Sequence, residues 1–180
     1  MVFQFCRESS YSTLLLPSKG MGITAAQKPL SEYRRNQGDR IGDNWMIPSV
    51  RKKRIIKYVL IDTNSWKTFF RERLLTAMGD PGSLSIWGKD EERHRLLAEH
   101  LSSEVSEPTS GRGRRVDIWS MLPGRDNHWL DGVVGCMVGA SILGCSLLAA
   151  PLRPRTTQKG EPQTITPKRI TPGTRIVPIR

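Results

Sequence analysis

The chain has 180 residues, of which 37% are hydrophobic and 25% charged, a composition typical of about one globular domain. Lys and Arg outnumber Asp and Glu by 28 to 17, and the net charge of +11 favours a protein that meets a polyanion over an enzyme for acidic substrates or a neutral structural module. Residues 151–180 contain seven basic residues and one acidic residue, a net charge of +6, which leaves +5 for residues 1–150.

The sequence has three cysteines, an odd number, and two of them lie inside an apolar run. This pattern does not predict a disulfide framework. The first ten residues lack the basic start and long apolar core of a secretory signal. Both observations favour a reducing compartment, and we expect a cytoplasmic protein.

The first half of the chain predicts few regular elements. Residues 1–16 resemble the end of a helix that leads to a short strand, and the Gly-, Pro-, Ser- and Arg-rich stretch 17–47 has no period, which predicts a long loop. The β-branched run 55–61 predicts a buried strand. Apolar residues at helical spacing predict a helix over 66–77, with Ser65 as its cap.

The second half alternates strands with helices. Residues 83–87 predict a strand, and a helix follows from its cap at residue 90 to about residue 105. The glycines and arginines of 111–115 predict a loop, and 115–122 alternates as a strand does. An apolar helix begins near Asn127. This order predicts an α/β fold in which helices cover both faces of a sheet.

The residues Gly132–Ala150 carry no charge, and their length of nineteen residues is near the minimum for a membrane span. Gly135 and Gly139 have the spacing that lets membrane helices approach closely. The alternative is a buried helix of a soluble domain, because glycines, serines and cysteines dilute the run and Asp131 adjoins it. We expect the soluble alternative and no membrane. Residues 151–180 hold six of the twelve prolines and predict a disordered tail behind a domain over 1–150.

Several strong motifs are missing from the sequence. It contains no GxxxxGK[ST], GxSxG, HExxH or paired CxxC, so it gives no support for a nucleotide-phosphate loop, a hydrolase of the GxSxG type, a zinc protease or structural zinc. Carboxylates at the ends of predicted elements remain as candidates for chemistry.

Asp62 ends the buried strand and Asp131 lies in the first turn of the apolar helix, with Asp126 as a neighbour of lower rank. Such rigidly held carboxylates can bind Mg or Mn, and two ions can stabilise a phosphodiester during cleavage. Lys67 is placed to neutralise the scissile phosphate if Asp62 is a ligand. The alternatives are a helix cap for Asp62 and a favourable charge near a helix N-terminus for Asp131.

Basic residues gather in three places outside the predicted elements, where they could contact phosphates; the alternative is a solvated surface. The candidates for DNA binding are Arg51, Lys52, Lys53, Arg54, Arg112, Arg114, Arg115 and Arg125.

The order of short motifs along the chain is more specific than any one of them. The series LLLPSKGMG, DNWMIP, YVLIDTNSWKTFFRERL, GDPGSLSIWG, HRLLAEHLSSE, GRGRRVDIW and DNHWLDGVVGCMVGASILG, over about residues 2–146, resembles the nuclease domain of GpA-type phage terminase large subunits. IDTNSWK and DNHWLD are its most specific parts.

The resemblance implies a ribonuclease-H-like fold with a mixed sheet covered by helices, and a Mg- or Mn-dependent endonuclease that cuts concatemeric viral DNA during packaging. It implies that Asp131 is a metal ligand, that Asp62 is the second acidic residue and that Lys67 assists. The implied partners are double-stranded DNA, a small terminase subunit and the portal, in the cytoplasm of a bacterial host or prophage-bearing cell.

The sequence also departs from the family. A packaging ATPase domain and a first nuclease strand with an acidic ligand precede the corresponding helix in the family, and neither is found here, so we expect an N-terminally incomplete domain of low activity. Two rival hypotheses stay open. One is a non-catalytic remnant of the same fold that binds DNA or the portal, and the other is a small membrane protein with one span at 132–150.

Overall fold

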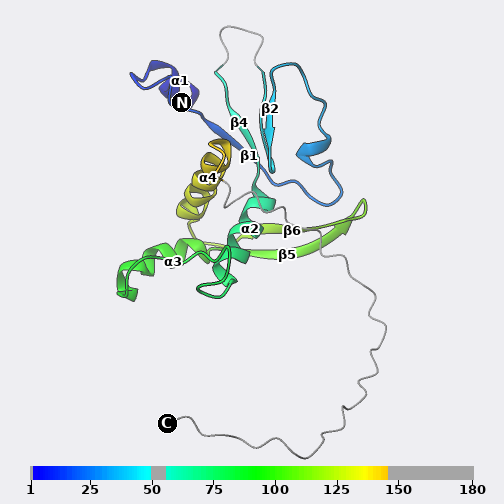
Figure 1. The fold of residues 1–180 in the computed structure, drawn as a ribbon. Coiled ribbons are helices and arrows are strands. Elements are labelled where there is room, and N and C mark those ends of the chain that lie inside the picture. The colour runs from blue at the N-terminus through cyan, green and yellow to red at the C-terminus, as the bar shows by residue number, and fades with distance from the viewer. Residues whose placement is uncertain (1, 50–55, 146–180) are drawn as a thin grey trace, which may run out of the picture.

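The computed structural model describes residues 2–49 and 56–145 (Figure 1). They form a mixed α/β structure with two separate sheets. In chain order the elements are α1 (Val2–Glu8), β1 (Ser18–Met21), the 3-10 helix η1 (Leu30–Glu32), β2 (Arg40–Gly42), β3 (Trp45–Ile47), β4 (Val59–Asp62), α2 (Thr63–Leu75), the 3-10 helix η2 (Glu91–His94), α3 (Arg95–Leu101), β5 (Glu104–Gly111), β6 (Arg114–Met121) and α4 (His128–Ile142).

The larger sheet has the strand order β1-β4-β3-β2. β1 runs parallel to β4, with Ser18 opposite Val59, whereas β3 pairs antiparallel with both β4 and β2. All four residues of β4 are buried. This pattern fits the continuous apolar run from which the strand is predicted, since a central strand packed on both faces has no polar side.

The predicted long loop over 17–47 needs correction, because β1, η1, β2 and β3 all lie within it. Each of these elements is only three or four residues long. Strands this short show almost no alternation in the sequence, and their pairing partners define them instead. The segment therefore supplies three of the four strands of the larger sheet.

The second sheet is the hairpin of β5 and β6, which pair antiparallel from Glu104 opposite Met121 to Gly111 opposite Arg114. The predicted loop over 111–115 is the tip of this hairpin. Its two turn residues, Arg112 and Gly113, both have positive φ, at 50° and 72°. A two-residue hairpin turn of type I′ requires positive φ at both positions, because its twist then matches that of the strands.

Two further predictions differ from the structure. The helix expected up to residue 105 ends at Leu101, and β5 begins at Glu104. The residues 83–87, predicted as a strand, form no strand within the described part of the chain. Neither sheet offers them a pairing partner, and a short apolar run does not form a strand without one.

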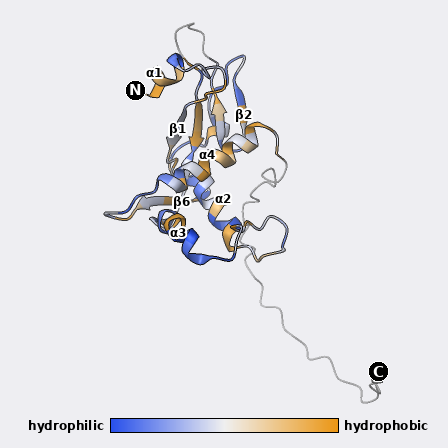
Figure 2. Cartoon of the chain, turned by 90° about the vertical axis from the view of Figure 1, so that its left-hand side faces the viewer, coloured by the Kyte–Doolittle hydropathy of each residue, from blue (hydrophilic) through white to orange (hydrophobic). Residues whose placement is uncertain are grey.

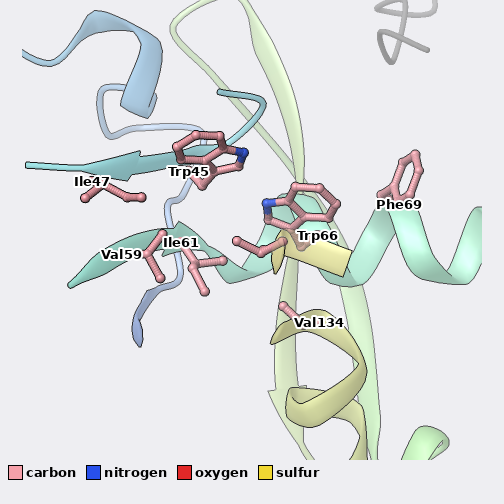
Figure 3. Close-up of a cluster of buried hydrophobic side chains, with 8 residues drawn as sticks. Trp45, Ile47, Val59, Ile61, Trp66, Phe69 and Val134 are labelled. Carbon is pink, nitrogen blue, oxygen red and sulfur yellow. The ribbon is translucent and has the colours of Figure 1, made fainter. Parts of the chain in front are cut away.

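Helices α2 and α4 pack together and against the larger sheet. The core cluster joins Trp45, Ile47, Val59 and Ile61 of the sheet with Trp66 and Phe69 of α2 and Val134 and Val138 of α4 (Figure 3). The Trp66 and Phe69 rings meet edge to face at 5.7 Å between centroids. Near the C-terminal end of α4, the Trp45 indole donates a hydrogen bond to Ser141 Oγ at 2.9 Å.

The apolar helix α4 buries one face only. Its buried residues Leu130, Val134 and Val138 are four apart, which places them in one stripe along the helix. Figure 2 shows hydrophobic residues concentrated in the larger sheet and α4, and hydrophilic ones around α3. Among the described residues, which include 132–145, no helix has the length and apolar character needed to cross a membrane.

Candidate active site

Asp62 is the N-cap of α2. Its Oδ1 accepts hydrogen bonds from the backbone N–H groups of Ile23 and Ser65, both at 3.4 Å, and its Oδ2 accepts one from Ser65 Oγ at 2.7 Å. Burial raises the pKa of the Asp62 carboxyl above its usual value, while these hydrogen bonds act in the opposite direction. The cap expected at Ser65 is therefore at Asp62, with Ser65 as its donor.

Lys67 lies one turn further along α2 and is almost fully buried, with 9% of its side chain exposed. Its Nζ lies 2.5 Å from Glu104 Oε1 and 3.1 Å from Asp131 Oδ1. The ammonium group thus joins two carboxylates from different elements, β5 and α4. An ammonium group buried without partners would be strongly destabilising, and the two carboxylates compensate its charge.

Asn127, the N-cap residue of α4, completes the group. Its side chain makes no capping bond to the helix and instead donates from Nδ2 to Glu104 Oε1 at 2.6 Å. Glu104 Oε1 therefore accepts from both Asn127 and Lys67. We call Lys67, Glu104, Asn127 and Asp131 the Lys67 cluster. Asn127 and Asp131 lie four residues apart, so the first turn of α4 presents both side chains on one face.

The chain around Ser103 holds Glu104 in place. Ser103 is fully buried; its Oγ donates to the carbonyl of His100 at 2.7 Å, and its own carbonyl accepts from Leu122 N–H at 2.8 Å. One residue later, the Glu104 side chain is only 3% exposed. The connection between α3 and the hairpin thus fixes the direction in which the carboxylate points.

Packing between α3 and α4 supports the same region. The His100 ring stacks on Trp129, with 5.5 Å between centroids and 19° between planes. Trp129 lies two residues before Asp131. The stack therefore ties the end of α3 to the turn of α4 that carries two members of the Lys67 cluster.

The structure joins two of the three predicted catalytic residues. Lys67 and Asp131 form an ion pair, whereas the hydrogen bonds that Asp62 accepts come from Ile23 and Ser65. At the surface, Asp126 Oδ1 lies 3.8 Å from His128 Nε2, and both side chains are exposed. Metal binding by Asp62 and by Asp126 stays a prediction.

Sequence reasoning missed Glu104 and the role of Asn127. Glu104 falls inside the helix predicted up to residue 105, where it looks like an ordinary surface residue. Its contacts reach 37 residues back to Lys67 and 23 residues forward to Asn127, so no local pattern could reveal them. The available signal is in DNHWLD, where an Asn at a helix start precedes an Asp by four residues.

The predicted DNA-binding arginines differ in what they contact. Arg112, Arg115 and Arg125 are exposed. Arg114 instead donates to the backbone carbonyls of residues 24, 25 and 27, at 3.3 and 3.4 Å for the first two, and so ties the hairpin to the loop after β1. The remaining four candidates, Arg51, Lys52, Lys53 and Arg54, lie outside the described residues.

The donor chemistry of the Lys67 cluster fits a divalent cation. Glu104 and Asp131 offer hard carboxylate oxygens that already converge on one cation, the Lys67 ammonium. In the described ranges 2–49 and 56–145, no three or more His, Cys, Asp or Glu side chains are grouped so that they could hold a metal. Mg²⁺ often binds through one or two carboxylates together with substrate phosphates, and this arrangement suits such a shared site.

Comparisons with known proteins identify no relative. No protein-family model matches the chain, and searches of the curated proteins and of the solved structures find no significant match.

Proposed function

We propose that the chain is a metal-dependent DNA endonuclease domain of the terminase type, with a ribonuclease-H-like arrangement of its mixed sheet. The observation that carries this proposal is the convergence of Glu104 and Asp131 on the Lys67 ammonium. Two carboxylates beside a cation provide the charges that phosphodiester cleavage needs. The motif series in the sequence supports the same assignment.

In this proposal Glu104, rather than Asp62, is the acidic partner of Asp131. A Mg or Mn ion at these carboxylates would polarise a phosphate oxygen and lower the pKa of a bound water. Asn127 keeps the Glu104 carboxylate oriented through its hydrogen bond to Oε1. Lys67 supplies a positive charge for the phosphate, and Asp62 fixes the start of the helix that carries Lys67.

The proposed substrate is double-stranded DNA, with a small terminase subunit and the portal as protein partners. The exposed Arg112, Arg115 and Arg125 support contacts to DNA phosphates, because arginine pairs well with phosphate oxygens and these side chains face solvent. Such contacts position the duplex without reading its sequence.

Plasmid nicking tests the proposal. Supercoiled DNA is incubated with Mg or Mn and with the wild type, Glu104→Gln or Asp131→Asn. Each of these nearly isosteric changes removes one carboxylate charge. We expect a loss of nicking of at least about 100-fold, because even the loss of a hydrogen-bond partner behind a metal ligand costs about 10- to 100-fold. Glu107→Gln, an exposed residue on the same strand, is the matched control and should cut like the wild type. Undiminished cleavage by Glu104→Gln and Asp131→Asn would refute this site.

One observation favours a second candidate, the non-catalytic DNA-binding remnant. The Lys67 cluster contains two carboxylates, and Lys67 already balances part of their charge. A wild type that binds DNA but nicks it with neither Mg nor Mn would support the remnant. Asp131→Asn should then bind DNA as the wild type does, because the basic residues remain.

A further inference from the structure

The position of the Lys67 ammonium has a consequence for metal binding that rests on the proposed function. Nζ contacts Glu104 Oε1 at 2.5 Å and Asp131 Oδ1 at 3.1 Å, so it lies in the gap between the two carboxylates. A divalent ion held by the same two oxygens would need about 2.0–2.6 Å to each of them. The ion and the ammonium would then occupy nearly the same place.

Charge makes the two cations mutually exclusive. A divalent ion and an ammonium group within a few ångströms repel each other, and the repulsion is strong where water is largely excluded. Lys67 is 9% exposed and Glu104 3% exposed, so solvent screens this gap poorly. Asp131, at 53%, forms its open side.

We infer that Lys67 is a built-in counter-cation of the metal-free site and that a divalent ion must displace its ammonium group before binding. The ammonium keeps the two carboxylates together when no metal is bound. The four-carbon stem of lysine is flexible enough to move the charge while the α2 backbone stays in place. Lys67 is thus a positioning residue for the carboxylates and an internal competitor for the metal.

Chemical labelling of the wild type tests the displacement directly. The protein is treated with an amine-acylating reagent with and without Mn²⁺, and peptide mass spectrometry follows Lys67 and the exposed Lys89. Without metal, Lys67 should react far more slowly than Lys89. Mn²⁺ should accelerate labelling of Lys67 at least about fivefold, the lower end of typical coupling between two binding events, and leave Lys89 unchanged. Unchanged or slower labelling of Lys67 would overturn the inference.

Titration with Mn²⁺ alone provides the second measurement. Lys67→Met and Lys67→Gln remove the competitor, so both should bind Mn²⁺ at least about fivefold more tightly than the wild type, whereas Lys89→Met should match it. Circular dichroism verifies the fold, and the glutamine variant serves if the methionine variant does not fold. Equal or weaker Mn²⁺ binding by the Lys67 variants contradicts the inference.

The two proposals fail in different ways. Mn²⁺-dependent exposure of Lys67 without any plasmid nicking keeps the inference and removes the nuclease. If nicking depends on Glu104 and Asp131 but Lys67 is equally protected in the presence and absence of Mn²⁺, the nuclease proposal is kept and the inference about Lys67 is removed. No Mn²⁺ binding by the wild type or by the Lys67 variants, together with no nicking of plasmid DNA, removes both.

Discussion

Asp62 and Lys67 are both buried ionisable residues, but the partners of their side chains differ in kind. Lys67 has two carboxylate partners, whereas Asp62 is satisfied by hydrogen bonds alone, and burial raises its pKa. A carboxyl with a raised folded-state pKa contributes stability that is fully present below its unfolded-state pKa. That stability is lost as the pH rises through the folded-state value.

This sign gives a prediction for Asp62→Asn. Asparagine is as good an N-cap as aspartate, so the variant keeps the cap and removes the charge. Between pH 4 and pH 7 the wild type should therefore lose free energy of unfolding relative to the variant, as measured by urea denaturation at both pH values. Asp62→Ala, which lacks the cap, should be about 1 kcal/mol less stable than Asp62→Asn. If Asp62→Asn retains nicking activity, Asp62 acts as a helix cap alone. If the variant loses nicking activity, Asp62 is also a metal ligand.

The two acidic partners of Lys67 should contribute unequally to stability. Glu104 is buried, so Glu104→Ala leaves the Lys67 ammonium without its closest partner and should cost about 3 kcal/mol of unfolding free energy. Half of the Asp131 side chain faces water, and Asp131→Ala should cost less than about 1 kcal/mol. Urea unfolding in EDTA measures both. A larger loss for Asp131→Ala would show that the ion pairs are ranked wrongly.

The β5–β6 hairpin places an arginine where the backbone favours another residue. Arg112 has a φ of 50° and precedes Gly113 in the two-residue turn, a position at which asparagine is preferred. Arg112→Asn should therefore raise the unfolding free energy by about 0.5 kcal/mol, of the order of other turn substitutions that fit their backbone. It should also weaken DNA binding at low salt. A more stable variant with unchanged DNA affinity would mean that Arg112 contacts no phosphate.

Long elements with a regular period could be predicted from the sequence, and short ones could not. The predicted ranges of β6, α2 and α4 agree with the observed ones to within a few residues. In each of these elements the alternation or the helical spacing extends over eight or more residues. β1 is defined as a strand by its pairing with β4, and β3 by its pairing with β4 and β2. Their residues alone do not specify a strand.

The candidate site shows the same division. The sequence predicts Lys67 and Asp131 as site residues because Lys67 closely follows the apolar run that ends at Asp62, and Asp131 immediately precedes the uncharged run of α4. Glu104 was missed because its role depends on two partners that are distant in the sequence. Asp62 was recognised both as a cap and as a ligand, and its hydrogen bonds to Ser65 establish the cap while metal binding stays a prediction.

The charge distribution along the chain predicts how DNA binding responds to salt. Each phosphate neutralised by Lys or Arg releases counterions, so we expect weak, sequence-independent duplex binding that falls steeply as salt rises. Residues 151–180 carry a net +6 of the total +11. Deleting them should flatten the plot of log affinity against log salt while leaving measurable affinity. Fluorescence anisotropy with a labelled duplex between 50 and about 200 mM salt measures the slope. A slope near zero for the full chain would argue against phosphate contacts.

The parallel pairing of β1 with β4 also bears on how quickly the chain reaches this structure. Ser18 lies opposite Val59, and all residues of η1, β2 and β3 lie in the intervening segment. The ends of that segment must meet, at a cost in chain entropy, before the parallel hydrogen bonds can compensate for it. Domains dominated by such distant pairings fold in milliseconds to seconds, whereas helical bundles fold in microseconds to milliseconds. Until β1 docks, β4 has one unpaired edge, and during this interval the chain is most open to pairing with another molecule.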